Sequence, residues 1–279
     1  QRYLLDRRLE RPGFGRMEEA QQLEMLNITR DGVPTLAAVL NFGIYPQGYL
    51  PQLAITAVVV PGKEIGQTAD KDAARFLDNK RIEGTIAEMV EDALNFCRRN
   101  MKTRTIIDPQ TGRRTDQTEY PISALREAIL NALIHRDYSI YTEGTPVQLD
   151  FFADRLEIHS PGSLYGRTTV EQLGYSRPDL RNPVLAVMAE SLTDAENRYS
   201  GIPTIRREMA AYGLPEPVFE TRRGEFVVTL YNGTDTAVQA ADAMPPDLLT
   251  FCSVPRSRQE IADFLGVKTV SYAIRQYVA

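Results

Sequence analysis

Apolar and polar positions along the first hundred residues predict helices at both ends of this stretch and apolar elements between them. Residues 1–30 are charged and helical in pattern, with a break at Pro12-Gly13. Leu36–Phe42 and Leu53–Val60 are apolar runs, which predict either two buried strands or a helix followed by a strand. The polar residues 63–79 predict a surface loop with a short helix, and Ile82–Met101 repeats apolar residues at helical spacing.

The following residues predict a series of short elements. Lys102–Thr118 is basic and turn-rich, which indicates a hairpin or a mobile link. Tyr138–Thr145 is a glycine-containing loop and a candidate lid, and Asn197–Pro203 is a second such loop. Alternation predicts strands at 147–152, 156–159 and 225–231, and helical spacing predicts helices at 167–173, 184–192 and 204–212.

The stretch Leu125–Ser139, LREAILNALIHRDYS, carries the most informative pattern. Its apolar residues at positions 125, 129 and 133 form one stripe on a helix. Glu127, Asn131 and His135 have the same spacing and form a polar stripe on the opposite side. Such a helix lines a polar cleft, or its polar side chains cap and satisfy neighbouring loops, and the pattern leaves both interpretations open.

The residues that end this stretch favour a structural role. We expect Asp137 to brace the following loop and Arg136 to pair with an acid such as Glu119 or Glu157. The alternative is that His135 and Arg136 contact a phosphate or a partner. The HRD triplet is not a kinase catalytic loop, because neither a glycine-rich strand nor a DFG motif accompanies it. We expect the second histidine, His159, to be a packed or rim residue.

Composition excludes several classes of protein. The 279 residues suffice for two domains or more, and the net charge of −5 argues against extensive coating by nucleic acid but allows one small basic reading surface. Two histidines and two distant cysteines, Cys97 and Cys252, predict neither a zinc site nor a disulfide framework, so we expect a cytoplasmic protein. No apolar run approaches the roughly 18 residues of a membrane helix, so we expect no membrane partner. Both ends stop inside helical patterns, so we also expect a fragment of a longer protein.

The C-terminal residues Pro255–Ala279 have the spacing of a helix-turn-helix. One predicted helix covers 258–265, a turn follows at Gly266, and a second helix covers 268–277. The alternative is a structural or dimerising helix pair. Helix-turn-helix readers use two half-sites, so we expect a homodimer. The second helix presents the candidate DNA-binding residues Lys268, Thr269, Ser271, Tyr272 and Arg275.

Several motifs together resemble a family of bacterial transcriptional regulators. These are EAILNALIHRDYS, DRLEIHSPGSLYG, RNPVLA, an SGI loop and GLPEPVF, within a likeness that spans about residues 30–231. Proteins of this kind are related to the RecG helicase C-terminus or to Schlafen/Alba-type DNA-binding proteins. The resemblance implies that residues 1–118 are an α/β remnant of, or linker from, a Schlafen/Alba-type domain. It also implies a winged helix, truncated here, at 247–279.

The central part of that family resembles the GHKL ATPases, in which a helix carries Glu-x-x-x-Asn. The resemblance implies that Glu127 is the catalytic residue that orients or deprotonates water, and that Asn131 holds Mg²⁺ on bound ATP. The candidate cofactor-binding residues are Asn131, His135, Ser160, Gly162, Ser200 and Gly201.

Two departures from the GHKL pattern bear on nucleotide binding. GHKL proteins read the adenine amino group with the carboxylate of Asp-x-Gly, whereas this chain has Ser160-Pro161-Gly162, whose hydroxyl accepts a hydrogen bond without a charge. Tyr199 stands where the family has a first glycine of its phosphate loop, and Pro203 lacks an N–H. No lysine motif of the Walker A type is present. We therefore expect an ATPase scaffold with at most weak or degenerate hydrolysis.

These observations predict an α+β protein. We expect a GHKL ATPase-like two-layer α/β sandwich at 119–232, preceded by the small α/β segment and followed by a linker at 233–246 and the all-α winged-helix fragment. The expected function is a DNA-binding transcriptional regulator whose GHKL-type module senses a nucleotide or another ligand. The alternatives are an ATP hydrolase with Glu127 as base and Asn131 holding Mg²⁺, and a non-catalytic interaction scaffold.

Overall fold

The computed structural model divides the chain into two units, Gln1–Asn232 and Gly233–Ala279. It describes residues 1–66, 75–107, 112, 114–177, 179–192 and 201–233. The expected winged helix and its five candidate DNA-binding residues, Lys268 to Arg275, therefore lie outside the described residues, as do Ser200 and all of the expected linker except Gly233.

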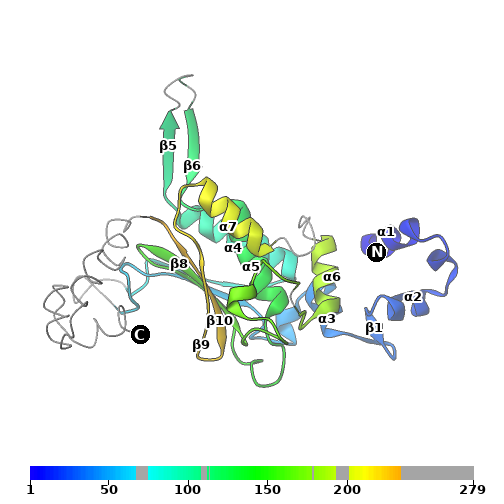
Figure 1. Ribbon diagram of the computed structural model, residues 1–279. Helices are drawn as coiled ribbons and strands as arrows, with labels where there is room; N and C mark the ends of the chain where they lie inside the picture. The colour runs from blue at the N-terminus through cyan, green and yellow to red at the C-terminus, as the bar shows by residue number, and fades with distance from the viewer. Residues whose placement is uncertain (67–74, 108–111, 113, 178, 193–200, 234–279) are drawn as a thin grey trace, which may run out of the picture. The chain divides into compact units, whose positions relative to one another are not determined.

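A six-stranded mixed sheet organises the first unit (Figure 1). β3 and β7 pair in parallel, whereas the other neighbouring strands pair antiparallel. Strands that precede and follow the boundary expected at residue 118 therefore build one sheet. The strand order is β4 (Asp78–Ile82), β3 (Ile55–Val59), β7 (Val147–Phe151), β8 (Arg155–Pro161), β10 (Glu225–Tyr231) and β9 (Val218–Arg222).

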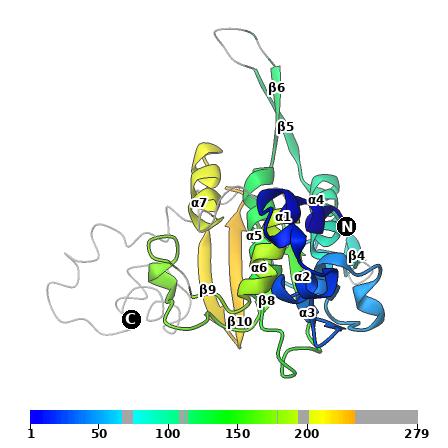
Figure 2. The same cartoon turned by 90° about the vertical axis from the view of Figure 1, so that its right-hand side faces the viewer.

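Helices cover one face of this sheet, as the two side views show (Figures 1 and 2). α4 (Ile86–Asn100) packs on β3 and β4, and α5 (Ile122–His135) packs on β8. α6 (Pro183–Leu192) and α7 (Gly201–Ala211) pack against α5. Thr85 and Glu88 begin α4 with a capping box, in which each side chain satisfies the other residue's backbone N–H. The predicted α+β class is confirmed.

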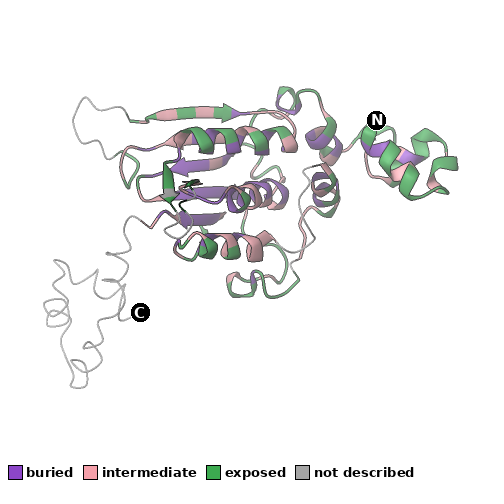
Figure 3. Ribbon diagram, turned by 90° about the horizontal axis from the view of Figure 1, so that it is seen from above, coloured by how far each residue is buried: buried purple, intermediate pink, exposed green. Residues whose placement is uncertain are grey.

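The hydrophobic core lies between the sheet and these helices (Figure 3). Alternate residues along the central strands point toward α5, because successive side chains of a strand lie on opposite faces. Leu149, Leu156, Ile158 and Leu230 are each at most 1% exposed. Burial of such side chains is the main source of stability, at about 25 cal/mol for each Å² of apolar surface removed from water.

Small elements precede the sheet. α1 (Arg2–Glu10) and α2 (Glu19–Met25) flank the predicted break at Pro12, with the 3₁₀ turn η1 (Phe14–Arg16) between them. β1 (Thr29–Arg30) and β2 (Val33–Pro34) form a short ribbon before α3 (Leu36–Phe42), and η2 (Pro46–Gly48) leads on toward β3. Of the two alternatives for this apolar region, the helix followed by a strand is confirmed.

The structure corrects three predicted elements. β4 begins at Asp78 within the expected loop and ends at Ile82, where a helix was expected, because a charged edge strand lacks the apolar signal of a buried one. α7 begins at Gly201 and includes Pro203, since a proline in the first helical turn loses no hydrogen bond. The helix expected at 167–173 is only the 3₁₀ turn η3 (Val170–Gln172).

The basic segment at 102–118 contains two strands, β5 (Thr103–Ile107) and β6 (Arg114–Thr118), which pair antiparallel as a hairpin. Of the two alternatives predicted for this segment, the hairpin is confirmed. Among the described residues, none belongs to a helix long and apolar enough to cross a membrane.

Candidate functional site

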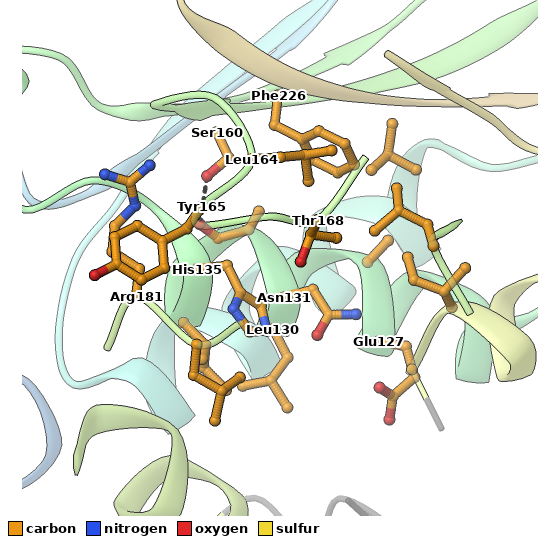
Figure 4. Close-up of a pocket in the computed structure, with 18 of the residues that line it drawn as sticks. Glu127, Leu130, Asn131, His135, Ser160, Leu164, Tyr165, Thr168, Arg181 and Phe226 are labelled. Atoms are coloured by element: carbon orange, nitrogen blue, oxygen red, sulfur yellow. Dashed lines mark hydrogen bonds between the residues drawn. The ribbon is translucent and has the colours of Figure 1, made fainter. Parts of the chain in front are cut away.

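Helix α5 is buried on most of its surface, and its polar stripe faces a cavity. Leu125, Ile129 and Leu133 are at most 1% exposed, and alanines between them are buried as well. Glu127, Asn131 and His135 are half-buried and line a cavity of about 350 Å³ (Figure 4). This volume is typical of small-molecule sites. The structure therefore favours the cleft interpretation of the polar stripe.

Residues from 163–177 and 179–181 line the cavity, and the loop expected to act as a lid does not. These residues, together with parts of β8, β10, α6 and α7, complete the wall around α5. None of the residues 138–145 belongs to the wall. The expectation of a lid at Tyr138–Thr145 is wrong, because the buried Arg136 guanidinium donates hydrogen bonds to the carbonyls of Thr142 and Thr145 and fixes this loop elsewhere.

One end of the cavity brings the first residue of α7 against the Glu-x-x-x-Asn motif. A Cβ atom built on Gly201 would lie 2.6 Å from Asn131 Nδ2 and 3.1 Å from Glu127 Oε2, so any larger residue would displace the Asn131 side chain. The first N–H groups of a helix lack intrahelical partners and favour anions. Buried Ile205 and Met209 hold α7 in place against the core.

This end of the cavity is acidic. Burial raises the pKa of Glu127, and the nearby Glu190 carboxylate raises it further, against the opposing effect of Arg126. The described residues provide no hydrogen-bond partner for the side chains of Glu127 and Asn131. Arg181 supplies the one guanidinium in the described wall and lies at the opposite end (Figure 4). A bound anion near Glu127 therefore needs a cation with it.

The opposite end of the cavity is formed around His135 and Ser160. Ser160 is 4% exposed and donates a 2.8 Å hydrogen bond from its hydroxyl to the carbonyl of Ala132, which leaves the oxygen free to accept one. Burial lowers the pKa of His135, so its imidazole is neutral at neutral pH. The Arg181 guanidinium lies over the Tyr165 ring, 5.0 Å from its centroid.

The HRD and SPG motifs contact each other behind this end. The Asp137 N–H donates to the carbonyl of Pro161 at 2.7 Å, and a Cβ atom on Gly162 would lie 2.6 Å from Asp137 Cβ. Gly162 has φ +100°, which other residues rarely adopt. Asp137 also accepts a 2.8 Å hydrogen bond from the Ser139 N–H and pairs with Arg181 at 3.3 Å. The predicted bracing role of Asp137 is confirmed.

Arg136 has a different environment from the one predicted. It is 1% exposed and bonds to backbone carbonyls, with its guanidinium over the Tyr138 ring. The expected pairing with Glu119 or Glu157 is wrong, because Glu119 lies beside Lys102 and Asn232 and Glu157 pairs with Arg155 and Arg222.

His159 lies on the face of the sheet opposite α4 and α5, in a network of buried charges. Its two ring nitrogens lie 3.1 Å from Glu157 and 3.2 Å from Glu225. Buried Asp150 lies 3.8 Å from the ring. Burial raises the pKa of Asp150 to about 6, despite the attraction of His159. Hydrogen bonds from His159 and Arg155 outweigh burial at Glu157 and lower its pKa to about 2. His159 is therefore a packed residue, as predicted.

The structure brings most of the sequence-predicted site residues together. Glu127, Asn131, His135, Ser160, Gly162 and Gly201 all line the cavity. Sequence reasoning missed Tyr165, Thr168, Asp179, Arg181 and Glu190, which also belong to the wall. The RNPVLA motif could have indicated Arg181. The amide of Asn182 in this motif donates to the carbonyls of Ile134 and Arg136 and thereby places Arg181 beside α5.

A metal ion in this cavity could not rest on a cluster of protein ligands. Within the described parts of the chain, no three His, Cys, Asp or Glu side chains form a group that could hold one. Asn131, the predicted Mg²⁺ ligand, could supply one oxygen, and the remaining ligands would come from water and from a bound anion.

Comparisons with known proteins bear on the fold and on part of the site. Residues 144–230 match the family model HATPase_c_4, described as "Putative ATP-dependent DNA helicase recG C-terminal". The match begins after α5, so it includes Ser160, Gly162 and Gly201 but not Glu127 and Asn131. No curated protein matches the chain.

A solved structure supports the fold. It is the crystal structure of the DIP2311 protein from Corynebacterium diphtheriae, with a TM-score of 0.60 and 19% sequence identity. The similarity covers 98% of this chain and 55% of that protein, so this chain spans about half the length of DIP2311. The chain thus carries, at residues 144–230, a region similar to the ATPase-like RecG C-terminal family.

Proposed function

We propose that this chain is a DNA-binding transcriptional regulator that senses a magnesium-bound adenine nucleotide in the cavity beside α5. The observation that carries the proposal is the close approach of Gly201 to the side chains of Glu127 and Asn131. It places the start of a helix, whose first N–H groups have no partner within the helix, beside an amide oxygen that suits Mg²⁺. The acidic surroundings also favour a ligand that arrives together with its cation.

The residues present fit such a ligand and have distinct roles. Mg²⁺, when bound, supplies charge neutralisation for the phosphates. Asn131 would hold the cation through its Oδ1 atom, and the start of α7 would bind a phosphate oxygen. Ser160 would accept a hydrogen bond from the amino group of the base, in place of the carboxylate of the GHKL proteins. The neutral His135 imidazole would offer a further donor or acceptor at that end.

Glu127 is the residue on which hydrolysis depends. Its raised pKa makes the carboxylate a better proton acceptor than an exposed glutamate. Among the described residues that line the cavity, no lysine or arginine lies beside Glu127 to stabilise the charge of a transferring phosphoryl group. We therefore propose ligand sensing as the main role and weak turnover as an accompanying activity.

Similarity of residues 144–230 to the ATPase-like RecG C-terminal family supports a nucleotide as the ligand. The DNA-binding part of the proposal rests on the helix-turn-helix pattern at residues 255–279, and a cytoplasmic homodimer is part of the same proposal. In this account the ligand changes the population of two conformations that differ in their affinity for DNA.

The proposal is tested by measuring the affinity of the full chain for DNA with and without Mg²⁺·ATP. We expect the dissociation constant to change by about 5- to 150-fold, the usual range of allosteric coupling. Asn131→Ala should abolish the change and keep the affinity measured without nucleotide. An unchanged affinity in the unaltered chain contradicts the sensor. Phosphate release that Glu127→Ala abolishes, without any effect of ATP on DNA binding, would instead favour the hydrolase alternative.

A further inference from the structure

The end of the cavity around Ser160 combines a hydrogen-bond acceptor with a strong donor (Figure 4). The Ser160 hydroxyl donates its hydrogen to the carbonyl of Ala132, so its oxygen is left to accept a bond from a ligand. Arg181 supplies the donor, since a guanidinium carries five N–H groups and no acceptor. A ligand that uses both groups therefore needs an acceptor for Arg181 and a donor for Ser160.

Contacts within the protein fix the Arg181 side chain beside the SPG turn. Its Nη2 donates a 2.9 Å hydrogen bond to the carbonyl of Ser163, and its Nη1 lies 3.3 Å from Asp137 Oδ2. Its guanidinium lies over the Tyr165 ring, and its Nε–H is buried without a hydrogen-bond partner among the described residues. Because these contacts use only part of the five N–H groups, donors of a preorganised side chain remain for a ligand.

The surroundings of Arg181 suit a neutral base better than a phosphate. The Asp137 carboxylate beside it offsets part of the guanidinium charge. The start of α7, where the proposed phosphate lies, is at the opposite end of the cavity. Leu130, Ile134 and Ile158 also line the cavity and are each at most 4% exposed. An apolar lining with a few fixed polar groups is typical of a site for a flat heterocycle.

The two purine bases offer different atoms to this pair of groups. Guanine has two neighbouring acceptors, O6 and N7, which one arginine binds with two parallel hydrogen bonds. Adenine has N7 beside an amino group, so an arginine can bond to N7 alone, and the amino group can donate to the Ser160 oxygen. When guanine binds, Ser160 keeps its bond to Ala132 and is not left unsatisfied. Each base thus makes two hydrogen bonds, divided differently between the two side chains.

We propose that the cavity binds guanine nucleotides as well as adenine nucleotides, and that Arg181 binds O6 and N7 of guanine. The inference rests on the proposed function, because it takes the base to lie at the Ser160 end of the cavity. A carboxylate in place of Ser160 would accept only and would repel O6, whereas the hydroxyl carries no charge and tolerates it. Selection of the base therefore depends on Arg181 rather than on Ser160.

The test is calorimetric titration of the full chain with Mg²⁺·ATP and, separately, with Mg²⁺·GTP. We expect the dissociation constant for GTP to be at most about tenfold above that for ATP, because each base makes two hydrogen bonds. Arg181→Met should weaken GTP binding about 10- to 150-fold more than ATP binding, because guanine loses two bonds to the guanidinium and adenine loses one. The ratio of the two constants is measured within one protein, so a general loss of stability does not change it.

Arg206→Met is the matched control. Arg206 donates a 2.9 Å hydrogen bond to the carbonyl of Leu173 and lies 5.1 Å from the centroid of the Tyr175 ring, in contacts of the same kind as those of Arg181. It is not among the described residues that line the cavity. We therefore expect this variant to leave the ratio of the two dissociation constants unchanged.

Each outcome decides the proposal. Comparable affinities, with a ratio that changes in Arg181→Met alone, support it. GTP binding more than tenfold weaker than ATP binding to the unaltered chain overturns the inference and leaves the proposed function standing. An equal change of the ratio in Arg206→Met overturns it, and so does an equal loss of both nucleotides in Arg181→Met, which would place a phosphate beside Arg181.

Two further results are decisive as well. If Arg181→Met does not fold, Arg181→Lys is measured in its place, because an ammonium keeps the charge beside Asp137 but cannot bind O6 and N7 as a planar fork. An unchanged ratio in that variant overturns the inference. If the unaltered chain binds neither nucleotide, the proposed function itself fails and this inference fails with it.

Discussion

Substitution of Gly201 by alanine should separate ligand binding from stability. The added Cβ would lie 2.6 Å from Asn131 Nδ2, closer than real Cβ contacts allow, so the Asn131 side chain must rotate away. Because that amide is the end of a flexible side chain, the fold has room to adjust. Alanine in place of glycine in a helix usually adds about 0.4–1 kcal/mol of stability. A hydrogen bond to a charged group contributes about 1.5–3 kcal/mol, so displacing Asn131 should weaken nucleotide binding by about 10- to 150-fold.

The assay is thermal denaturation of the variant with and without Mg²⁺·ATP. We expect the melting temperature without ligand to stay equal or rise, and the increase caused by a fixed concentration of nucleotide to become smaller. Gly13→Ala is the matched control, since Gly13 has helical backbone angles and a Cβ atom added to it would meet nothing within 4 Å. A Gly201→Ala protein that binds nucleotide as tightly as the unaltered chain would refute the reasoning.

Three further predictions follow from the same structure. The increase in melting temperature with ATP should require Mg²⁺, because acidic Glu127 and Glu190 line that end of the cavity; an equal increase in the presence of EDTA would contradict this. Asp150→Asn should raise the free energy of unfolding by up to about 3 kcal/mol at pH 8 and by nothing below pH 4, measured by urea denaturation. The sign follows because the pKa of Asp150 is about 6 in the folded chain and 3.8 in the unfolded chain, so the neutral carboxyl stabilises the fold at a pH below 3.8 and this contribution is lost as the pH rises through about 6. An equal effect of the substitution at both pH values would refute this reasoning. Arg136→Lys should cost about 2–3 kcal/mol, because one ammonium cannot bond to the same carbonyls as the planar guanidinium, and a loss below about 0.5 kcal/mol in the same assay would disprove that role.

The sequence predicted those features that depend on local pattern. The spacing of Glu127, Asn131 and His135 placed all three on one side of α5, and the alternation at 225–231 predicted the strand β10. The pairing of the HRD and SPG motifs has a physical basis, since Asp137 and Gly162 lie in contact.

Features that depend on distant parts of the chain could not be read from the same patterns. β4 is a polar strand whose identity depends on its pairing with β3, and Arg136 bonds to carbonyls that become available only when the loop after it folds back. Asp179 and Glu190 reach the cavity from segments without a local signal for chemistry. The contribution of residues from 163–177 and 179–181 to the cavity wall is likewise a tertiary property.

Calorimetric titration of the full chain with Mg²⁺·ATP tests the central claim most directly. We predict saturable binding to the unaltered chain and at least tenfold weaker binding to Asn131→Ala, since tenfold corresponds to about 1.4 kcal/mol and the Asn131 amide contributes about that much or more. Absence of binding to the unaltered chain at millimolar nucleotide, or equal affinities of the two proteins, would contradict the assignment of the cavity beside α5 as a nucleotide site.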